Sequence, residues 1–242
     1  MKIRLDQLLL LQGLAPTLKK AQAIIAAGQV LVNDQPVDKV GSLFAEDCQI
    51  RLKGKTCPYV SRGGLKLAAG LDHFQIDPTG LVCADIGAST GGFTDCLLQR
   101  GAAKVYAIDV GYGQLAWKLR QDPRVVVLER TNARNLQTSD LTDLLDLAVI
   151  DASFISLKTL LPPLLVLFSG AIRVLALIKP QFEVDKGQIG TGGVIRDSDL
   201  HEEVIEKVRG FAGRLGLVPV GVSPSPILGP KGNREFLIYL VS

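Results

Sequence analysis

A short apolar run that ends in an acid and opens into a glycine-rich turn constrains the fold of this chain more than any other feature. Residues 82–86 read Val-Cys-Ala-Asp-Ile, and three glycines follow within six residues, starting at Gly87. Such a strand–turn–helix unit presents backbone N–H groups to a ligand at the carboxyl end of the first strand of an α/β sheet. A second apolar run, residues 105–108, leads into Asp109, which is placed to accept hydrogen bonds from a ribose. The sequence therefore predicts a site for a nucleotide-like ligand.

The spacing of the glycines narrows the ligand class. Gly87-x-x-x-Gly91-Gly92 is not the G-x-G-x-x-G of dinucleotide binders, and no Gly-Lys-Ser/Thr follows, as a P-loop requires. From Asp85 onward, Asp-x-Gly-x-x-x-Gly-Gly resembles the first motif of S-adenosylmethionine-dependent methyltransferases, in which the acid and the turn hold the methionine part of the cofactor. The resemblance implies that the cofactor contacts Asp85, Gly87, Ala88, Ser89, Gly91, Gly92, Phe93, Thr94, Asp109, Val110, Asn132 and Ala133.

Apolar runs alternate with segments of helical length through the rest of the chain. We expect strands near residues 82–85, 105–109, 125–129, 147–151, 174–179, 217–223 and 235–241. The alternation is typical of a parallel, doubly wound sheet. The connection between the last two runs is too short for a crossover helix, so those two strands should pair antiparallel. The predicted fold class is α/β, a Rossmann-like methyltransferase domain with a seven-stranded, mostly parallel sheet and an antiparallel last strand.

The N-terminal quarter of the chain has its own pattern and charge. Two short helices, residues 4–12 and 17–27, precede strand signals near residues 29–32, 37–40 and 48–52, which predicts a small α+β module. Residues 1–62 carry nine Lys and Arg against five Asp and Glu, and the remaining residues carry 18 against 19. The excess of positive charge therefore gathers where a polyanion could bind.

The run Ala27-Gly-Gln-Val-Leu-Val-Asn33, with the basic helix before it, resembles the αL-motif RNA-binding domain first seen in a small-subunit ribosomal protein. The resemblance implies RNA contacts from Arg4, Lys19, Lys20 and Arg62. The alternative is an amphipathic helix pair with solvated lysines. We expect this domain to span residues 1–56, a linker to span 57–64 and the methyltransferase domain to span 65–242.

Four charged residues stand where the predicted topology gathers them. Asp151 and Lys179 close two parallel strands, and Glu235 opens the strand expected to run antiparallel, so all three lie at one edge of the sheet. Lys66, on the helix that enters the domain, can cover the same edge. Each alone could be a solvated strand-end charge. The set resembles the Lys-Asp-Lys-Glu tetrad of FtsJ-type ribose 2′-O-methyltransferases, and with the N-terminal module the whole chain resembles the TlyA family, often named hemolysins.

That resemblance implies a chemistry and a substrate. A ribose hydroxyl must lose its proton as it attacks the methyl group, and a lysine can take the proton or stabilise the developing alkoxide. We assign this role to Lys179, with Asp151 orienting it and favouring the cationic sulfonium, and with Lys66 and Glu235 fixing Lys179 and the ribose. In this family the product is a 2′-O-methylcytidine in ribosomal RNA, so ribosomal RNA or ribosomal subunits are the expected partners.

The cysteines, two aromatic residues and the absence of a recognisable signal or membrane segment carry less information about function. Cys83 and Cys96 are expected in the core, and no cysteine–histidine spacing indicates a metal site. Tyr112 and Trp117 either line the adenine pocket or pack in the core. No signal peptide or membrane span is recognised, which favours a cytoplasmic protein without a membrane partner.

Four other functions fit the sequence less well. The glycine spacing argues against a nicotinamide oxidoreductase. Base-directed methyltransferases need a different motif after the fourth strand, or a nucleophilic cysteine at a strand end. A membrane-lysing toxin lacks an obvious membrane segment. An RNA-binding protein without catalysis is disfavoured because the tetrad is complete.

Overall fold

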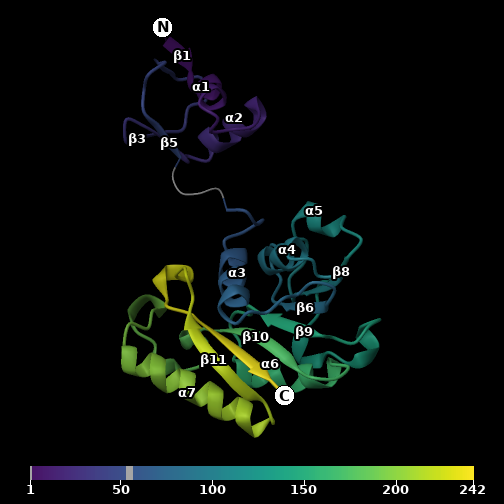
Figure 1. Ribbon diagram of the computed structural model, residues 1–242. Helices are drawn as coiled ribbons and strands as arrows, with labels where there is room; N and C mark the ends of the chain where they lie inside the picture. Colours follow the sequence, from purple (N-terminus) through teal and green to yellow (C-terminus); the bar gives the residue numbers. More distant parts are fainter. Residues whose placement is uncertain (1, 53–56) are drawn as a thin grey trace. The chain divides into compact units, whose positions relative to one another are not determined.

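The computed structural model describes residues 2–52 and 57–242, and its contacts divide the chain into two compact units, residues 1–56 and 57–242 (Figure 1). The end of the expected first domain, residues 53–56, lies outside the described residues. No helix in the described part of the chain has the length and hydrophobicity that crossing a bilayer requires.

The N-terminal unit packs two helices on small antiparallel sheets. Its elements are β1 (Lys2–Arg4), α1 (Leu5–Leu11), α2 (Leu18–Ala26), β2 (Val30–Val32), β3 (Gln35–Val37), β4 (Leu43–Ala45) and β5 (Ile50–Leu52). The strand order is β3-β2-β5, and β1 pairs separately with β4. Asn33 and Asp34 both have positive φ and form the two-residue hairpin turn that joins β2 to β3. β3 therefore starts two residues before the strand expected near 37–40, and Pro36 is tolerated because β3 is an edge strand.

The buried face of α2 explains why its two lysines are exposed to solvent. Thr17 caps it by accepting a hydrogen bond from the Lys20 backbone N–H at 3.2 Å. Ala21, Ile24 and Ile25 recur at helical spacing and are buried in the core of this unit. The side chains of Lys19 and Lys20 lie outside this apolar face and are exposed.

The second unit is a three-layer α/β domain. Its strands are β6 (Val82–Ile86), β7 (Lys104–Ile108), β8 (Val125–Leu128), β9 (Leu147–Ile150), β10 (Arg173–Ile178), β11 (Val218–Pro224) and β12 (Phe236–Val241). Its α-helices are α3 (Gly63–His73), α4 (Gly92–Gln99), α5 (Trp117–Arg120), α6 (Leu157–Leu164) and α7 (Ser198–Arg214). Short 3-10 turns are η1 (Ala133–Asn135), η2 (Thr138–Asp140), η3 (Leu165–Leu167), η4 (Pro180–Phe182), η5 (Lys186–Gln188), η6 (Thr191–Gly193) and η7 (Pro230–Gly232).

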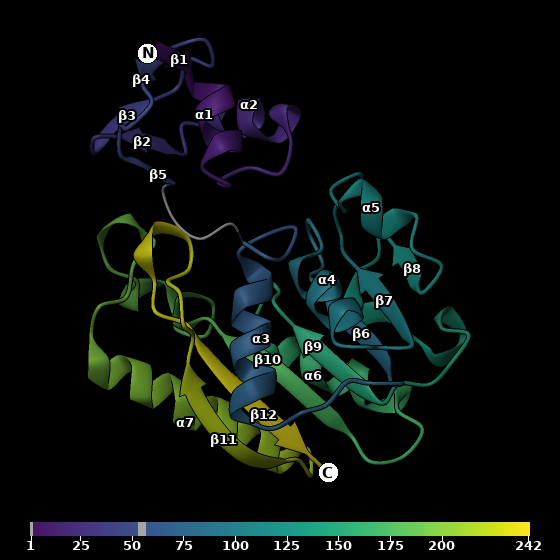
Figure 2. The same cartoon turned by 45° about the horizontal axis from the view of Figure 1, so that its top comes forward.

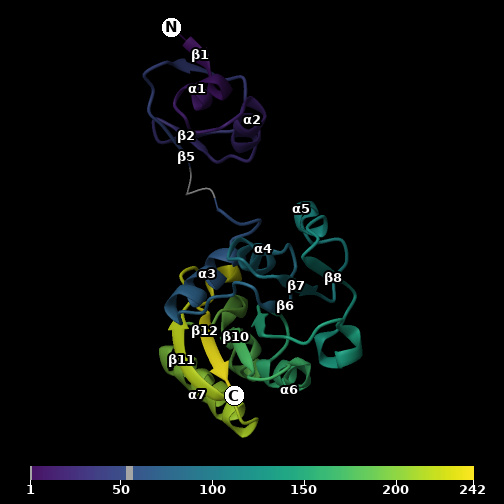
Figure 3. The same ribbon diagram turned by 45° about the vertical axis from the view of Figure 1, so that its right-hand side comes forward.

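The seven strands form one sheet in the order β11-β12-β10-β9-β6-β7-β8, with β11 and β8 at its opposite ends (Figure 3). The neighbours from β10 to β8 pair parallel, whereas β12 lies antiparallel between β10 and β11. The mostly parallel sheet and the antiparallel pairing of the last two strands are confirmed. Because β12 runs in the opposite direction, its first residue lies at the edge where the parallel strands end.

Helices cover both faces of the sheet (Figure 2). On one face, α3, α4 and α5 pack against strand residues that include Cys83, Val105 and Val149. On the other face, α6 and α7 pack against strand residues that include Ala84 and Tyr106. Because successive side chains of a strand point to opposite faces of the sheet, the strands contribute apolar side chains to both cores, as expected for a doubly wound sheet.

The segment 57–64, expected as a linker, packs on the second unit. The Val60 backbone N–H donates to Asp95 on α4 at 2.7 Å, and α3 begins at Gly63, two residues before the predicted helix start. A Cβ on Gly64 would lie 2.3 Å from Cγ of Tyr59. Only glycine lets Tyr59 cover the first turn of α3, and this contact holds the segment before the helix in place.

Candidate active site

The glycine turn between β6 and α4 brings two strand ends into close contact. Gly87 has a φ of +85°, and a Cβ there would lie 2.9 Å from Cα of Ala152, just past the end of β9. The turn is fixed from below by Asp85, whose Oδ2 accepts hydrogen bonds from the Thr94 N–H at 2.9 Å and from its hydroxyl at 2.7 Å. The open surface of the turn therefore consists mainly of backbone.

Asp85 lies beneath the site and not on its surface. Its side chain is fully buried, and its Oδ1 has no hydrogen-bond partner in the described part of the chain. Burial raises the pKa of this carboxyl to about 7, although the two hydrogen bonds from Thr94 act in the opposite direction. Asp85 supports the turn through Thr94.

Asp109 connects the turn to the next strand end. Its Oδ2 accepts a hydrogen bond from the Ser89 N–H at 2.8 Å, and its Oδ1 accepts one from the Gly111 N–H at 2.7 Å. It lines a cavity of about 380 Å³, together with Val110, Asn132 and other residues from the ends of β6, β7 and β9. This volume falls in the range of small-ligand sites.

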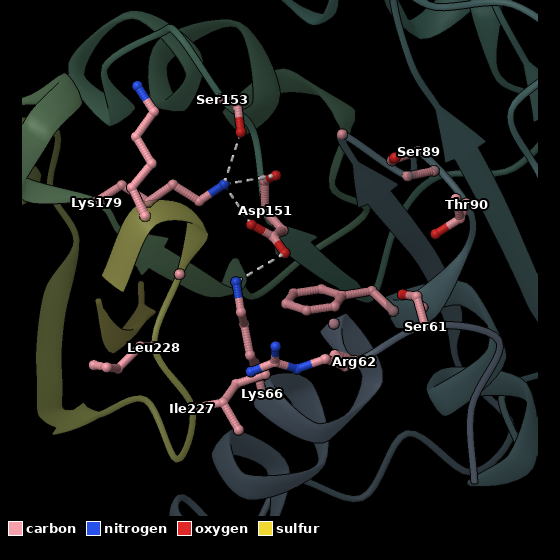
Figure 4. A pocket seen from close by; sticks show the side chains of 17 residues that line it. Ser61, Arg62, Lys66, Ser89, Thr90, Asp151, Ser153, Lys179, Ile227 and Leu228 are labelled. Atoms are coloured by element: carbon pink, nitrogen blue, oxygen red, sulfur yellow. Dashed lines mark hydrogen bonds and ion pairs between the residues drawn. The ribbon is translucent and has the colours of Figure 1, made fainter. Parts of the chain in front are cut away.

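A second cavity of about 470 Å³ adjoins the first, because Gly87, Ser89, Asp151 and Ser153 line both. Its walls come from the glycine turn, the start of α3, the end of β10 and the loop before β12, and Figure 4 shows Lys66 and Lys179 pointing toward Asp151. The site therefore joins a backbone-lined half to a half lined by charged side chains.

Three of the four predicted charged residues, Lys66, Asp151 and Lys179, line this second half (Figure 4), and Glu235 joins them through its ion pair with Lys66. Lys179 Nζ lies 2.6 Å from Asp151 Oδ1 and donates hydrogen bonds to the Asp151 carbonyl at 3.2 Å and to Ser153 Oγ at 3.0 Å. Lys66 Nζ lies 2.6 Å from Glu235 Oε2 and 3.7 Å from Asp151 Oδ2. The expected clustering at one edge of the sheet is what the structure shows.

Burial makes this cluster unusual. Lys66, Lys179 and Glu235 are each at most 7% exposed, and charged side chains are seldom so buried unless they are paired. Two cations and two anions alternate here, so the net charge is small while each lysine keeps a fixed direction. Asp151 contacts both lysines and stands between the two cavities.

A third cavity, of about 290 Å³, shares Ser153 and Lys179 with the larger of the two adjoining cavities. It is lined by Ser153, Phe154, Lys179, Gln181, Phe182, Ile189, Gly193, Lys231, Asn233 and Glu235. Phe154 is 90% exposed and has a φ of +63°, a strained backbone for a bulky residue. Its ring centroid lies 5.1 Å from that of Phe182. An aromatic pair made of exposed Phe154 and half-buried Phe182 therefore borders the buried lysine.

The sequence-predicted cofactor residues fall into two groups. Those at the surface of the two adjoining cavities are Gly87, Ala88, Ser89, Gly92, Phe93, Asp109, Val110, Asn132 and Ala133. Asp85, Gly91 and Thr94 do not line either cavity, and Asp85 and Thr94 are completely buried. Asn132 also caps η1, since its Oδ1 accepts from the Arg134 N–H at 3.1 Å.

Two predicted aromatic residues lie away from the site, and two residues that line it were not predicted from the sequence. Tyr112 and Trp117 are 68% and 71% exposed and line none of these cavities, so neither packs in the core. Cys83 and Cys96 are fully buried, as expected. Ser153 and Phe154 were not predicted, although Ser153 follows Asp151 by two residues and the spacing could have indicated it.

The predicted RNA-binding residues occupy exposed positions in both units. The Arg4 guanidinium donates two hydrogen bonds to buried Asp6, and this interaction holds the pKa of Asp6 below its ordinary value. Lys19 and Lys20 project from α2, and Arg62 lines the larger of the two adjoining cavities. Arg4 is thus partly committed to the fold of its own unit.

The family of FtsJ-like methyltransferases matches residues 59–242. The chain belongs to this family. The S4 domain matches residues 3–46 of this methyltransferase, within the N-terminal unit. The methyltransferase also belongs to the TlyA group, as its similarity to full-length relatives shows.

Three relatives illustrate that similarity. The chain is 48% identical over 240 residues to YqxC of Bacillus subtilis, described as a candidate rRNA methyltransferase, covering 99% of this chain and 85% of that protein. It is 46% identical to the 16S/23S rRNA (cytidine-2′-O)-methyltransferase TlyA of Mycobacterium tuberculosis, covering 99% and 90%. A solved structure of a candidate hemolysin from Streptococcus thermophilus is 45% identical and superposes with a TM-score of 0.78, covering 100% of this chain and 88% of that one.

Proposed function

We propose that this methyltransferase transfers a methyl group from S-adenosylmethionine to the ribose 2′-hydroxyl of a cytidine in ribosomal RNA. The observation that carries the proposal is the Lys66–Glu235 and Lys179–Asp151 pairing at the border of the glycine-turn cavities. The name of the Mycobacterium tuberculosis relative states the same reaction for that protein. A ribosomal substrate is met in the cytoplasm, where we expect the protein to act.

The two adjoining cavities suit the cofactor. Backbone at Gly87 and Ser89 offers polar contacts for the amino-acid part, and the carboxylate of Asp109 faces the position of a ribose. Ala133, Ile155 and Leu160 supply an apolar wall for the adenine. When bound, S-adenosylmethionine supplies an electrophilic methyl group on a sulfonium centre. The carboxylate of Asp151 lines both cavities and favours that positive charge.

The lysines provide the polar environment for the acceptor hydroxyl. Lys179 is held in direction by Asp151 and Ser153. As the ammonium ion it stabilises the 2′-oxygen as negative charge develops, and only as the free amine does it take the proton of the 2′-hydroxyl. Lys66, held by Glu235, adds a second positive charge on the other side of Asp151. Positioning the hydroxyl for in-line attack supplies much of the rate.

The acceptor nucleoside would enter from the side of the third cavity. Phe154 and Phe182 offer an aromatic surface next to Lys179, and an unstacked base gains about 1–3 kcal/mol from stacking on such a surface. A base stacked there would direct its ribose toward Lys179. The S4 domain would add sequence-independent phosphate contacts through Lys19 and Lys20.

Methyl transfer from radiolabelled S-adenosylmethionine tests the proposal. The protein is incubated with free 16S and 23S rRNA and with intact small and large subunits, and methylated positions are mapped by resistance of the 3′ phosphodiester to alkaline cleavage. Label on the ribose of a cytidine is expected in at least one of these RNAs. Label on a base, or no label on any RNA, would contradict the proposal.

A further inference from the structure

Two residues that line the third cavity, Gln181 and Glu235, each have a buried Oε1 without a hydrogen-bond partner in the described part of the chain. The other carboxylate oxygen of Glu235 is paired with Lys66, so Gln181 carries the neutral acceptor of the two. Leaving a buried acceptor unpaired is unfavourable. Gln181 lines the third cavity, between the buried Lys179 and the aromatic Phe182. A ligand that brings a donor into this cavity would recover that cost.

The other amide at this cavity serves the fold. Asn233 Oδ1 accepts from the Ile195 N–H at 3.1 Å, and its Nδ2 donates to the Gly193 carbonyl at 3.0 Å. Both ends of this amide hold the loop after η6 against the loop before β12. The contrast leaves Gln181 as the amide at this cavity whose acceptor oxygen is not used by the neighbouring loops.

The turn that carries Gln181 is firmly held. η4 follows directly on β10, and the Phe182 N–H donates to the Lys179 carbonyl at 2.8 Å. Glu183, next in sequence, accepts hydrogen bonds from Ser156 Oγ and from the Leu157 N–H. It thereby ties η4 to the loop that presents Phe154. Lysine, amide and aromatic pair therefore form one preorganised wall.

We propose that Gln181 selects cytosine over uracil at the acceptor position by accepting a hydrogen bond from the exocyclic amino group of the base. Cytosine carries an N4 amino donor where uracil carries an acceptor oxygen. With the amide in the orientation of the free protein, a uracil would leave Oε1 unpaired and place a second acceptor against it, which is the kind of mismatch that gives strong discrimination. The inference rests on the proposed 2′-O-methyl transfer and adds a specificity-determining residue to it.

The test uses ribosomal subunits whose methylated cytidine, mapped as above, is replaced by uridine in plasmid-encoded rRNA. Methyl transfer to both subunit preparations is measured for the full-length protein and three variants. Wild-type protein should prefer cytidine by roughly 10- to 100-fold in kcat/KM. If the unaltered subunits are not methylated at all, the proposed function fails and not the role of Gln181.

Each variant has a different expected signature. Gln181→Leu removes the acceptor and should reduce the cytidine preference to within about threefold, chiefly by slowing transfer to cytidine. Gln181→Glu can only accept, so it should retain cytidine and reject uridine at least as strongly as wild type. Phe154→Ala should slow transfer to both by a similar factor and keep the ratio, because stacking is tolerant of base identity.

Two further readouts separate specificity from structural damage. Cofactor affinity of Gln181→Leu should match wild type and its thermal unfolding temperature should be equal or higher, since the lost oxygen is buried without a hydrogen-bond partner in the described part of the free protein. An unchanged cytidine-to-uridine ratio in Gln181→Leu would overturn the proposal. So would faster transfer to uridine than to cytidine in Gln181→Glu.

Discussion

The two halves of the candidate active site differ in the groups that form their surfaces. On the cofactor side, backbone and short polar contacts make the surface, and the acids Asp85 and Asp109 are engaged with groups of their own turns. On the acceptor side, long charged side chains from four separate elements meet, and the acceptor oxygen of Gln181 has no hydrogen-bond partner among the residues that the structure describes. We call the first half, formed by the glycine turn, the cradle. The second half is a surface of charged side chains that we propose binds the acceptor.

The comparison predicts that damage to the acceptor side removes chemistry and spares cofactor binding. Lys179→Ala should reduce methyl transfer by roughly 10²- to 10⁴-fold, because it deletes the group that we propose acts on the reacting hydroxyl. Calorimetry should show cofactor affinity within a few-fold of wild type. Lys207→Ala, which removes an exposed lysine paired with Glu203 on α7, is the matched control and should transfer methyl groups normally. Full activity of Lys179→Ala would refute its assigned role.

A substitution in the cradle should instead weaken cofactor binding. Gly87→Ala places a Cβ 2.9 Å from the backbone of Ala152 and forces a side chain into a φ of +85°. We expect cofactor affinity to fall by at least about tenfold and stability to fall by about 1–3 kcal/mol. Gly80→Ala is the control, because Gly80 also has positive φ but nothing within 4 Å of its added Cβ. Equal cofactor loss in both variants would show that strain alone explains the effect.

The buried acid under the cradle should make stability depend on pH. Its raised pKa of about 7 means that native Asp85 keeps a proton that the unfolded chain has lost above pH 4. The free energy of unfolding should therefore fall as pH rises toward 7 and then level off, with a contribution of about 2–3 kcal/mol between pH 5 and pH 8. Urea unfolding at these two pH values should give a smaller difference for Asp85→Asn than for wild type. An identical difference would place the ionisation elsewhere.

The N-terminal unit offers the smallest expected effect. Replacing Lys19 and Lys20 with Ala should weaken rRNA binding several-fold and reduce the slope of log affinity against log salt by about 1–2. Filter binding at several salt concentrations measures that slope. Binding of S-adenosylmethionine should not change. An unaltered slope would mean that this face of α2 does not contact phosphate.

The cofactor side could be predicted from sequence because its signal is local. Asp85, Gly87 and Asp109 lie at strand ends within one short stretch, and their spacing reflects how a chain turns from strand to helix. The tetrad could be predicted because parallel strands end at one edge, and because an antiparallel strand begins there.

The aromatic and amide groups of the acceptor side could not be found in this way. Phe154 depends on a left-handed backbone that its residue type disfavours, and the availability of Gln181 depends on which amide the neighbouring loops use. Residue type also misled at Trp117, because a large aromatic side chain is usually buried and this one is exposed. Such features follow from loop conformation, which carries little periodic signal.

The place of β12 between β10 and β11 has a consequence for synthesis. Glu235 stands at the start of this strand, and its partner Lys66 is made 169 residues earlier. As the chain emerges from the ribosome, Lys66, Asp151 and Lys179 can gather before the carboxylate that balances Lys66 exists. The sheet then also lacks an inner strand. A nascent chain of this enzyme should therefore be unable to modify RNA until β12 has been made and has inserted, which would protect ribosomal RNA from an incomplete catalyst.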